Sequence, residues 1–188
     1  MAYANALSAQ QGLSQCYTLF GCSGTPGVFL SSCTGVTFAG TSCPGYRLPT
    51  DAEWEYAARA GDPRAFYTGD ITACSIMMCV DDPALDMAGW YCQNSMSTTH
   101  AVSGKTPNAW GLYDMLGNVW EWCGDWYGTY PGTNTPDYAG SAMGSSRARR
   151  GGSEVSNAVS ARAARRGSLE PDFRDFVLGF RLCRSVVP

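Results

Sequence analysis

The residues PNAWGLYDMLGNVWEWCGDW, at positions 107–126, contain four of the six tryptophans of the chain. One tryptophan side chain can bury about 200 Å² of surface, so we expect this stretch to form part of the core. The interleaved glycines exclude a long helix. Residues 119–122 fit a short strand instead, with Trp120 and Trp122 on one face and Val119 and Glu121 on the other.

Two carboxylates lie within this stretch, Asp114 and Glu121. A buried charge needs a compensating cation or hydrogen bonds. One interpretation is a calcium site, formed by these two side chains and the carbonyl oxygens of Gly117 and Val119. The other is that the aspartate caps a turn and an arginine holds the glutamate. The spacing alone favours the second interpretation.

The composition is that of a globular protein of 188 residues, with 45% hydrophobic and 15% charged residues, which suits one domain. The 22 glycines and 10 prolines predict many turns and few long elements. The net charge of −3 gives no reason to expect nucleic acid as a partner. Nine of the 13 basic residues nevertheless lie between Arg147 and Arg184. They either bind anions or form an ion-paired framework, and their regular spacing favours the framework.

The chain has nine cysteines and one histidine, His100. This combination argues against a structural zinc site and favours disulfides formed in an oxidising compartment, with at least one cysteine left over. The cysteine usage suggests an exported or cell-surface setting, although the first residues lack the features of a signal peptide. No stretch is apolar enough to cross a membrane, so we predict no membrane insertion. His100 lies in a polar loop, and we assign it no catalytic role.

Two helices are predicted. The first covers residues 2–11 and ends at Gly12. The second begins after a capping box formed by Thr50 and Glu53 and runs to Ala60, with Trp54, Ala57 and Ala58 facing inward.

Four motifs resemble the formylglycine-generating enzyme, or sulfatase-modifying factor, family: GYRLPTDAEWEYAARAG (45–61), PNAWGLYDMLGNVWEW (107–122), RRGGS (149–153) and GFRL (179–182). They occur in the family's order between residues 45 and 182. The resemblance implies an α+β, C-type lectin-like fold of the formylglycine-generating-enzyme type, loop-rich, with short antiparallel strands and about two helices. It implies one domain over residues 1–188 without the family's N-terminal strands, and calcium on Asp114, Gly117, Val119 and Glu121.

The chain departs from the family at the copper site. The two copper-binding cysteines of the active oxidases correspond to Ser156 and Ala161. Copper(I) prefers thiolate ligands, which a hydroxyl and a methyl group cannot replace. Copper is therefore not expected, and we predict that the chain is not an oxidase. The alternatives are a member of the oxidase family that recruits thiols from elsewhere, and a fixed non-catalytic paralogue.

Residues 151–182 also resemble the variable region of diversity-generating retroelement proteins, which bind ligands through hypervariable residues on a lectin-like scaffold. The resemblance implies a fixed frame of glycine, arginine and proline residues. It implies ligand contacts at the positions between them, with a protein or another surface ligand as the partner. These positions are Glu154, Val155, Ser156, Asn157, Val159, Ser160, Ala161, Ala163, Arg165, Gly167, Ser168, Leu169, Glu170, Phe173, Asp175, Phe176 and Val177. Phe173 and Phe176 suit exposed anchors, unless they pack beneath their own loop.

Overall fold

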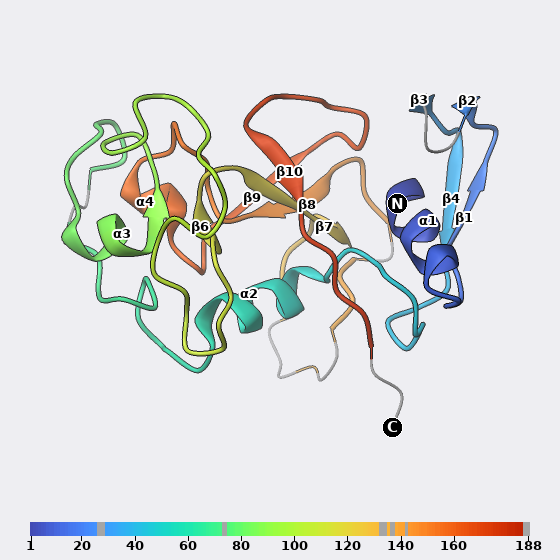
Figure 1. Ribbon diagram of the computed structural model, residues 1–188, viewed down its shortest axis with the longest axis horizontal. Coiled ribbons are helices and arrows are strands. Elements are labelled where there is room, and N and C mark those ends of the chain that lie inside the picture. Colours follow the sequence, from blue (N-terminus) through green and yellow to red (C-terminus); the bar gives the residue numbers. More distant parts are fainter. Residues whose placement is uncertain (26–28, 73–74, 132–134, 136–137, 142, 186–188) are drawn as a thin grey trace. The chain divides into compact units, whose positions relative to one another are not determined.

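The computed structural model describes residues 1–25, 29–72, 75–131, 135, 138–141 and 143–185 (Figure 1). The chain divides into two compact units. The first consists of Met1–Pro49 and Arg181–Pro188, and the second consists of Thr50–Phe180.

The first unit begins with helix α1 (Ala2–Gln10), which is the predicted N-terminal helix. Two antiparallel pairs of short strands follow, in which β1 pairs with β4 and β2 with β3. These strands are β1 (Tyr17–Phe20), β2 (Ser23–Thr25), β3 (Phe29–Ser32) and β4 (Gly35–Phe38). The buried cluster of this unit is small and consists of Ala4, Cys16, Tyr17 and Cys43.

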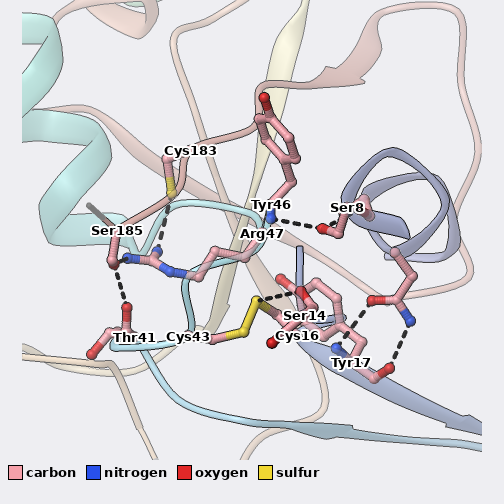
Figure 2. Close-up of a disulfide and its surroundings, with 12 residues drawn as sticks. Ser8, Ser14, Cys16, Tyr17, Thr41, Cys43, Tyr46, Arg47, Cys183 and Ser185 are labelled. Carbon is pink, nitrogen blue, oxygen red and sulfur yellow. Dashed lines mark hydrogen bonds between the residues drawn. A yellow bond between two sulfur atoms is a disulfide. The ribbon is translucent and has the colours of Figure 1, made fainter. Parts of the chain in front are cut away.

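Disulfides join parts of this unit that are distant in sequence. Cys16 is bonded to Cys43, as Figure 2 shows, and Cys22 is bonded to Cys33. The Asn5 side chain holds the Tyr17 backbone through two hydrogen bonds, of 2.6 and 3.1 Å. The prediction of disulfides is thus confirmed, and a third, Cys79–Cys92, lies in the second unit.

The second unit is built on a four-stranded sheet of order β10-β7-β8-β9, in which β10 is parallel to β7 and the other pairs are antiparallel. Its strands are β7 (Trp120–Trp126), β8 (Arg147–Arg150), β9 (Arg166–Leu169) and β10 (Leu178–Phe180). A separate parallel pair consists of β5 (Gly89–Trp90) and β6 (Leu116–Gly117). The helices are α2 (Asp51–Arg59), α3 (Pro83–Ala88) and α4 (Ala158–Ala161).

Helix α2 begins as its sequence predicts. The Glu53 amide donates to Thr50 Oγ1 at 3.1 Å, and the Thr50 amide donates to Glu53 Oε2 at 2.8 Å, which is a complete capping box. The helix ends with Ala60 in the left-handed region, at φ 46°. Trp54 and Ala58 are buried as predicted, and they form part of the core of this unit.

The tryptophan-rich stretch forms the expected strand, but β7 is longer than the predicted residues 119–122 and continues to Trp126. The described residues contain four helices where about two were predicted. The two additional helices, α3 and α4, have only six and four residues. Their N-caps, Asp82 and Asn157, each accept hydrogen bonds from amides of the first turn.

Candidate ligand-binding face

The four-stranded sheet has two different faces. On one face Cys123 of β7 and Ala148 and Arg150 of β8 are fully or almost fully buried, and this face packs against α2. On the other face Trp122 of β7 and Arg149 of β8 are partners across the strands and remain partly exposed. Figure 1 shows α2 on one side of the sheet and the loop that leads into β10 on the opposite side. We name the side opposite α2 the outer face.

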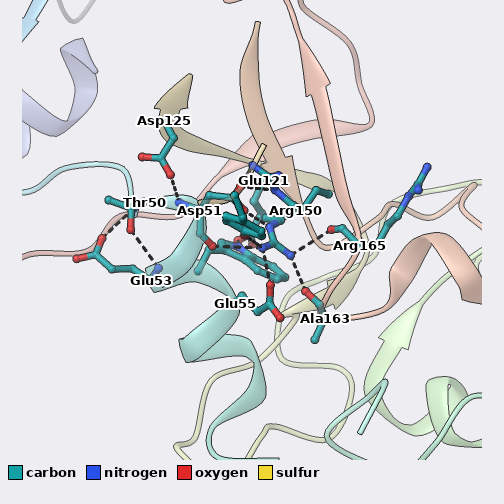
Figure 3. A network of polar contacts seen from close by, with 12 residues as sticks. Thr50, Asp51, Glu53, Glu55, Glu121, Asp125, Arg150, Ala163 and Arg165 are labelled. Atoms are coloured by element: carbon teal, nitrogen blue, oxygen red, sulfur yellow. Dashed lines mark hydrogen bonds and ion pairs between the residues drawn. The ribbon is translucent and has the colours of Figure 1, made fainter. Parts of the chain in front are cut away.

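A charged network fixes the inner face (Figure 3). The guanidinium of Arg150 is fully buried, where it pairs with Asp51 and donates to Glu55 Oε2 at 2.6 Å. It also donates to the Ala163 carbonyl at 2.7 Å. Arg166 pairs with the second oxygen of Asp51 at 2.6 Å. The framework interpretation is therefore confirmed for these two arginines.

Two other arginines of β8 stack on tryptophans. The guanidinium carbon of Arg147 lies 3.6 Å from the ring centroid of Trp126, and that of Arg149 lies 4.4 Å from the centroid of Trp120. Burial lowers the pKa of Arg149, while the negative charge of Asp175 opposes this shift. Both guanidinium groups are thus engaged with aromatic rings, as cation–π pairs.

A hollow of about 330 Å³ opens on the outer face. The sheet contributes Trp122, Leu178, Gly179 and Phe180, and the loop before β10 contributes residues 171–175. Trp122 and Phe180 are partners across the parallel β7–β10 pair, so their side chains project on the same side. Phe173 of the loop is 44% exposed, and Phe176 beside it is 77% exposed. Neither phenylalanine is packed beneath its loop.

The predicted ligand contacts differ in exposure. The exposed positions are Val155, Arg165, Glu170, Phe173, Asp175 and Phe176. The partly buried positions are Ser156, Asn157, Val159, Ser160, Gly167, Ser168, Leu169 and Val177. The fully or almost fully buried positions are Glu154, Ala161 and Ala163. These last three lie beneath the surface, where they cannot touch a ligand directly.

The structure brings only two of the predicted contacts, Phe173 and Asp175, into the wall of the hollow. Sequence reasoning missed Trp122, Asp172 and Phe180, which also line it. The alternation along β7 could have indicated Trp122, because a residue two positions from Trp120 projects from the same face. The parallel pairing with β10 joins segments more than 50 residues apart in the sequence and left no comparable local signal.

Glu154 is in an unusual environment for a carboxylate. Its side chain is fully buried, and among the described residues neither carboxylate oxygen has a hydrogen-bond partner. Its backbone is well held, because its amide donates to the Asn118 carbonyl at 2.9 Å and its carbonyl accepts from Ser95 Oγ at 2.6 Å. Burial raises the pKa of Glu154, and the charge of Asp175 raises it further.

The two positions that correspond to the copper ligands contain no thiol. The Ser153 amide donates to Ser156 Oγ at 2.9 Å, and Ala161 is buried at the end of α4. Among the described cysteines, Cys123 and Cys183 are not in disulfides. Burial raises the pKa of Cys123 well above its ordinary value, which disfavours the thiolate. Within the described part of the chain, no three His, Cys, Asp or Glu side chains gather as a metal site.

The turn predicted to hold calcium has a strained backbone. Asp114, Gly117 and Asn118 have positive φ angles of 54°, 75° and 62°. Asp114 Oδ2 accepts from the Ser103 amide at 2.7 Å, and Glu121 Oε2 accepts from Trp54 Nε1 at 2.7 Å. Both carboxylates are buried. The side-chain oxygens of Asp114 and Glu121 and the carbonyl oxygens of Gly117 and Val119 are hard donors, the ligand type that calcium takes.

His100 contacts Trp90, Ser95 and Asn118. Its ring stacks on Trp90 with centroids 3.8 Å apart, and its Nε2 lies 2.9 Å from the Ser95 carbonyl oxygen. Its amide donates to Asn118 Oδ1 at 3.0 Å. These contacts tie the loop around residue 100 to the tryptophan-rich turn.

Within the described part of the chain, no helix has both the length and the hydrophobicity that a membrane span needs.

Comparison with known proteins gives matches over most of the chain. Residues 1–186 match the family model described as "Sulfatase-modifying factor enzyme 1-like domain". A formylglycine-generating enzyme of Streptomyces coelicolor is 38% identical over 149 residues, which are 73% of this chain and 46% of the enzyme. The serine/threonine-protein kinase pkn1 of Chlamydia pneumoniae is 33% identical over 169 residues, which are 86% of this chain and 25% of the kinase.

Among solved structures, Treponema denticola variable protein 1 superposes with a TM-score of 0.79 at 34% identity. The match covers 98% of this chain and 67% of the variable protein. This similarity confirms the predicted α+β, C-type lectin-like fold of the formylglycine-generating-enzyme type. The chain spans about half the length, or less, of the curated relatives described above.

Proposed function

Since the chain belongs to the sulfatase-modifying factor enzyme 1-like domain family, we propose that it uses the family's fold to bind a ligand and not to catalyse a reaction. The binding surface consists of the loop before β10, the hollow beside it and the exposed positions between residues 155 and 177. In this proposal the surface is variable, as in diversity-generating retroelement proteins. The similarity to a variable protein over 98% of the chain supports this choice.

The exposed aromatic loop is the observation on which the proposal mainly depends. Residues 170–176 are all exposed, and they include two phenylalanines that no core contact explains. Exposed aromatic side chains at the edge of a concave surface are typical anchors of protein interfaces. The loop begins and ends at strands of a sheet whose inner face is fixed by buried ion pairs, so a rigid scaffold presents it.

The absence of thiols at Ser156 and Ala161 argues against an oxidase. Copper(I) would need two close sulfur ligands, and here one position is a hydroxyl hydrogen-bonded within its own turn and the other is a buried methyl group. The non-catalytic alternative to a variable binder is a fixed paralogue with one ligand.

Calcium is the proposed structural cofactor. Asp114 and Glu121 would supply carboxylate oxygens, and Gly117 and Val119 would supply carbonyl oxygens. Bound there, the ion would neutralise two buried carboxylates at the junction of β6 and β7.

Sequencing of the encoding DNA across a population of source cells tests the variable surface. We expect substitutions to concentrate at the exposed and partly buried positions between 155 and 177 and to spare Gly151, Gly152, Arg166 and Pro171. The codons for residues 107–122, read in the same experiment, are the control and should be uniform. Uniform codons throughout would overturn the variable surface and leave a fixed paralogue.

Stoichiometric copper(I) binding, together with oxidation of a cysteine-containing peptide, would overturn the non-catalytic assignment.

A further inference from the structure

The hollow on the outer face is lined by three aromatic rings. Trp122 and Phe180 come from adjacent strands, and Phe173 comes from the loop opposite them. Phe180 is 50% exposed, so two of these rings offer about half of their surface to solvent. The face of an aromatic ring carries partial negative charge, so a wall of such rings attracts cations.

Charged groups at the rim add to this preference. Asp172 and Asp175 line the hollow, and the one basic residue in its lining is Arg174. Two carboxylates against one guanidinium give the lining a net negative charge. The charge of Asp175 also opposes the fall that burial causes in the pKa of Arg149, and it adds to the rise in the pKa of Glu154.

We propose that this hollow binds a cationic group, namely the ammonium or guanidinium group of a lysine or arginine side chain on a protein ligand. The inference rests on the proposed binding function and specifies the chemistry of its anchor. The rings of Trp122, Phe173 and Phe180 contact the cation, and Asp172 and Asp175 pair with it at the rim. A volume of about 330 Å³ suits one side chain and not a whole peptide.

A preference for an anion would require the charge of Arg174 to outweigh the charges of Asp172 and Asp175. A carboxylate in the hollow would meet three aromatic rings and two like charges for one guanidinium. A neutral apolar group would gain from the rings but not from the carboxylates. The charge of a small probe therefore distinguishes the three cases.

The test uses the whole chain and three probes of similar size: butylguanidinium, pentanoate and pentan-1-ol. Binding is followed by NMR at the Trp122 indole and the phenylalanine rings. We expect saturable shifts with butylguanidinium, weaker binding at high salt, and binding weaker by about ten-fold or more for the other two probes. Absence of butylguanidinium binding, or equal binding of pentanoate, would overturn the inference.

Variants locate the binding site. Phe173→Ala and Asp175→Asn should each weaken butylguanidinium binding by about three- to ten-fold. Tyr56→Ala is the matched control, because this exposed ring belongs to α2, on the side of the sheet opposite the hollow, and does not line it. It should leave the affinity unchanged, and an equal loss in Tyr56→Ala would overturn the assignment to the hollow.

The result of the cation-binding test is independent of the result of the codon sequencing that tests the proposed function. Variable codons combined with no cation binding would sink the inference and retain the variable surface. Uniform codons combined with selective cation binding would retain the cation site on a fixed paralogue.

Discussion

Asp125 lies at the end of β7, almost fully buried, and its Oδ2 accepts a hydrogen bond from the Asp51 amide. Burial is the largest cause that raises its pKa, to about 6, and the charges of Asp51 and Glu53 add to the effect. In the unfolded chain an aspartate titrates near 3.8. The native state therefore holds the Asp125 proton more tightly than the unfolded state does.

This difference predicts a pH dependence of stability. The contribution of Asp125 is fully present below the unfolded pKa and is lost as the pH rises through about 6. Asp125→Asn, whose amide oxygen can still accept from the Asp51 amide, should remove this dependence, which amounts to about 2–3 kcal/mol. Urea unfolding of both proteins between pH 4 and 8 measures it.

The exposed Asp70→Asn substitution is the control and should leave the slope unchanged. If the wild-type and Asp125→Asn proteins gave parallel curves over this range, the buried carboxylate would not be the cause.

Glu154 shows what the sequence could not predict at the scale of one residue. Its position in the chain predicts a ligand contact, while the structure buries it completely. Its amide donates a hydrogen bond to the Asn118 carbonyl, and its carbonyl accepts one from Ser95 Oγ, which holds this residue inward. Both partners are distant in the sequence. The residues next to Glu154 in the sequence therefore give no signal of these contacts.

At the scale of elements, Arg150 connects β8 to α2. Its guanidinium pairs with Asp51 and Glu55 of the helix while its backbone belongs to the sheet. The Arg150 guanidinium is fully buried, so its loss would leave Asp51 in the interior with one arginine, Arg166, in place of two.

Arg150→Met should therefore lower the free energy of unfolding by about 3–5 kcal/mol. The matched control is Arg149→Met on the same strand, because that side chain lies on the outer face and stacks on Trp120. Its loss should be about 1 kcal/mol. Chemical denaturation measures both, and equal losses would show that the inner network does not hold the helix to the sheet.

The elements differ in how well the sequence predicts them. Helix α2 has its capping box, its inward tryptophan and its terminating glycine within 12 residues, so all of its signals are local. Strand β10 has three residues, and what defines it is its pairing with β7. Helix α4 begins at its Asn157 cap and has four residues, a length too short for a periodic sequence pattern. Length and locality therefore decide which elements could be predicted.

At the scale of the whole molecule, calcium would act on stability through mass action. A ligand that binds only the native state raises the free energy of unfolding, by about 2.7 kcal/mol at 100 times its dissociation constant. We expect a chelator to lower the melting temperature of the protein and added calcium to restore it.

Glu121→Gln should abolish the response to chelator, whatever its effect on the melting temperature itself. Asp172→Asn, an exposed carboxylate in the wall of the hollow, should keep the full response. A wild-type melting temperature that does not change with chelator would count against the calcium site.

The candidate site as a whole was predicted in part. The motifs indicate the scaffold and the approximate segment of the binding face, because those residues follow one another along the chain. The hollow itself could not be predicted, since it forms where Trp122, Phe173 and Phe180 meet from separate segments. Only the pairing of β7 with β10 brings them together.

The exposed loop 170–176 has a consequence for the evolution of the chain. None of its side chains belongs to either buried cluster, and the frame around it is fixed by contacts made elsewhere. Most substitutions in the loop should therefore be nearly neutral for folding, so mutational drift there meets little purifying selection from stability. A new binding preference can arise in this loop without a compensating mutation in the core.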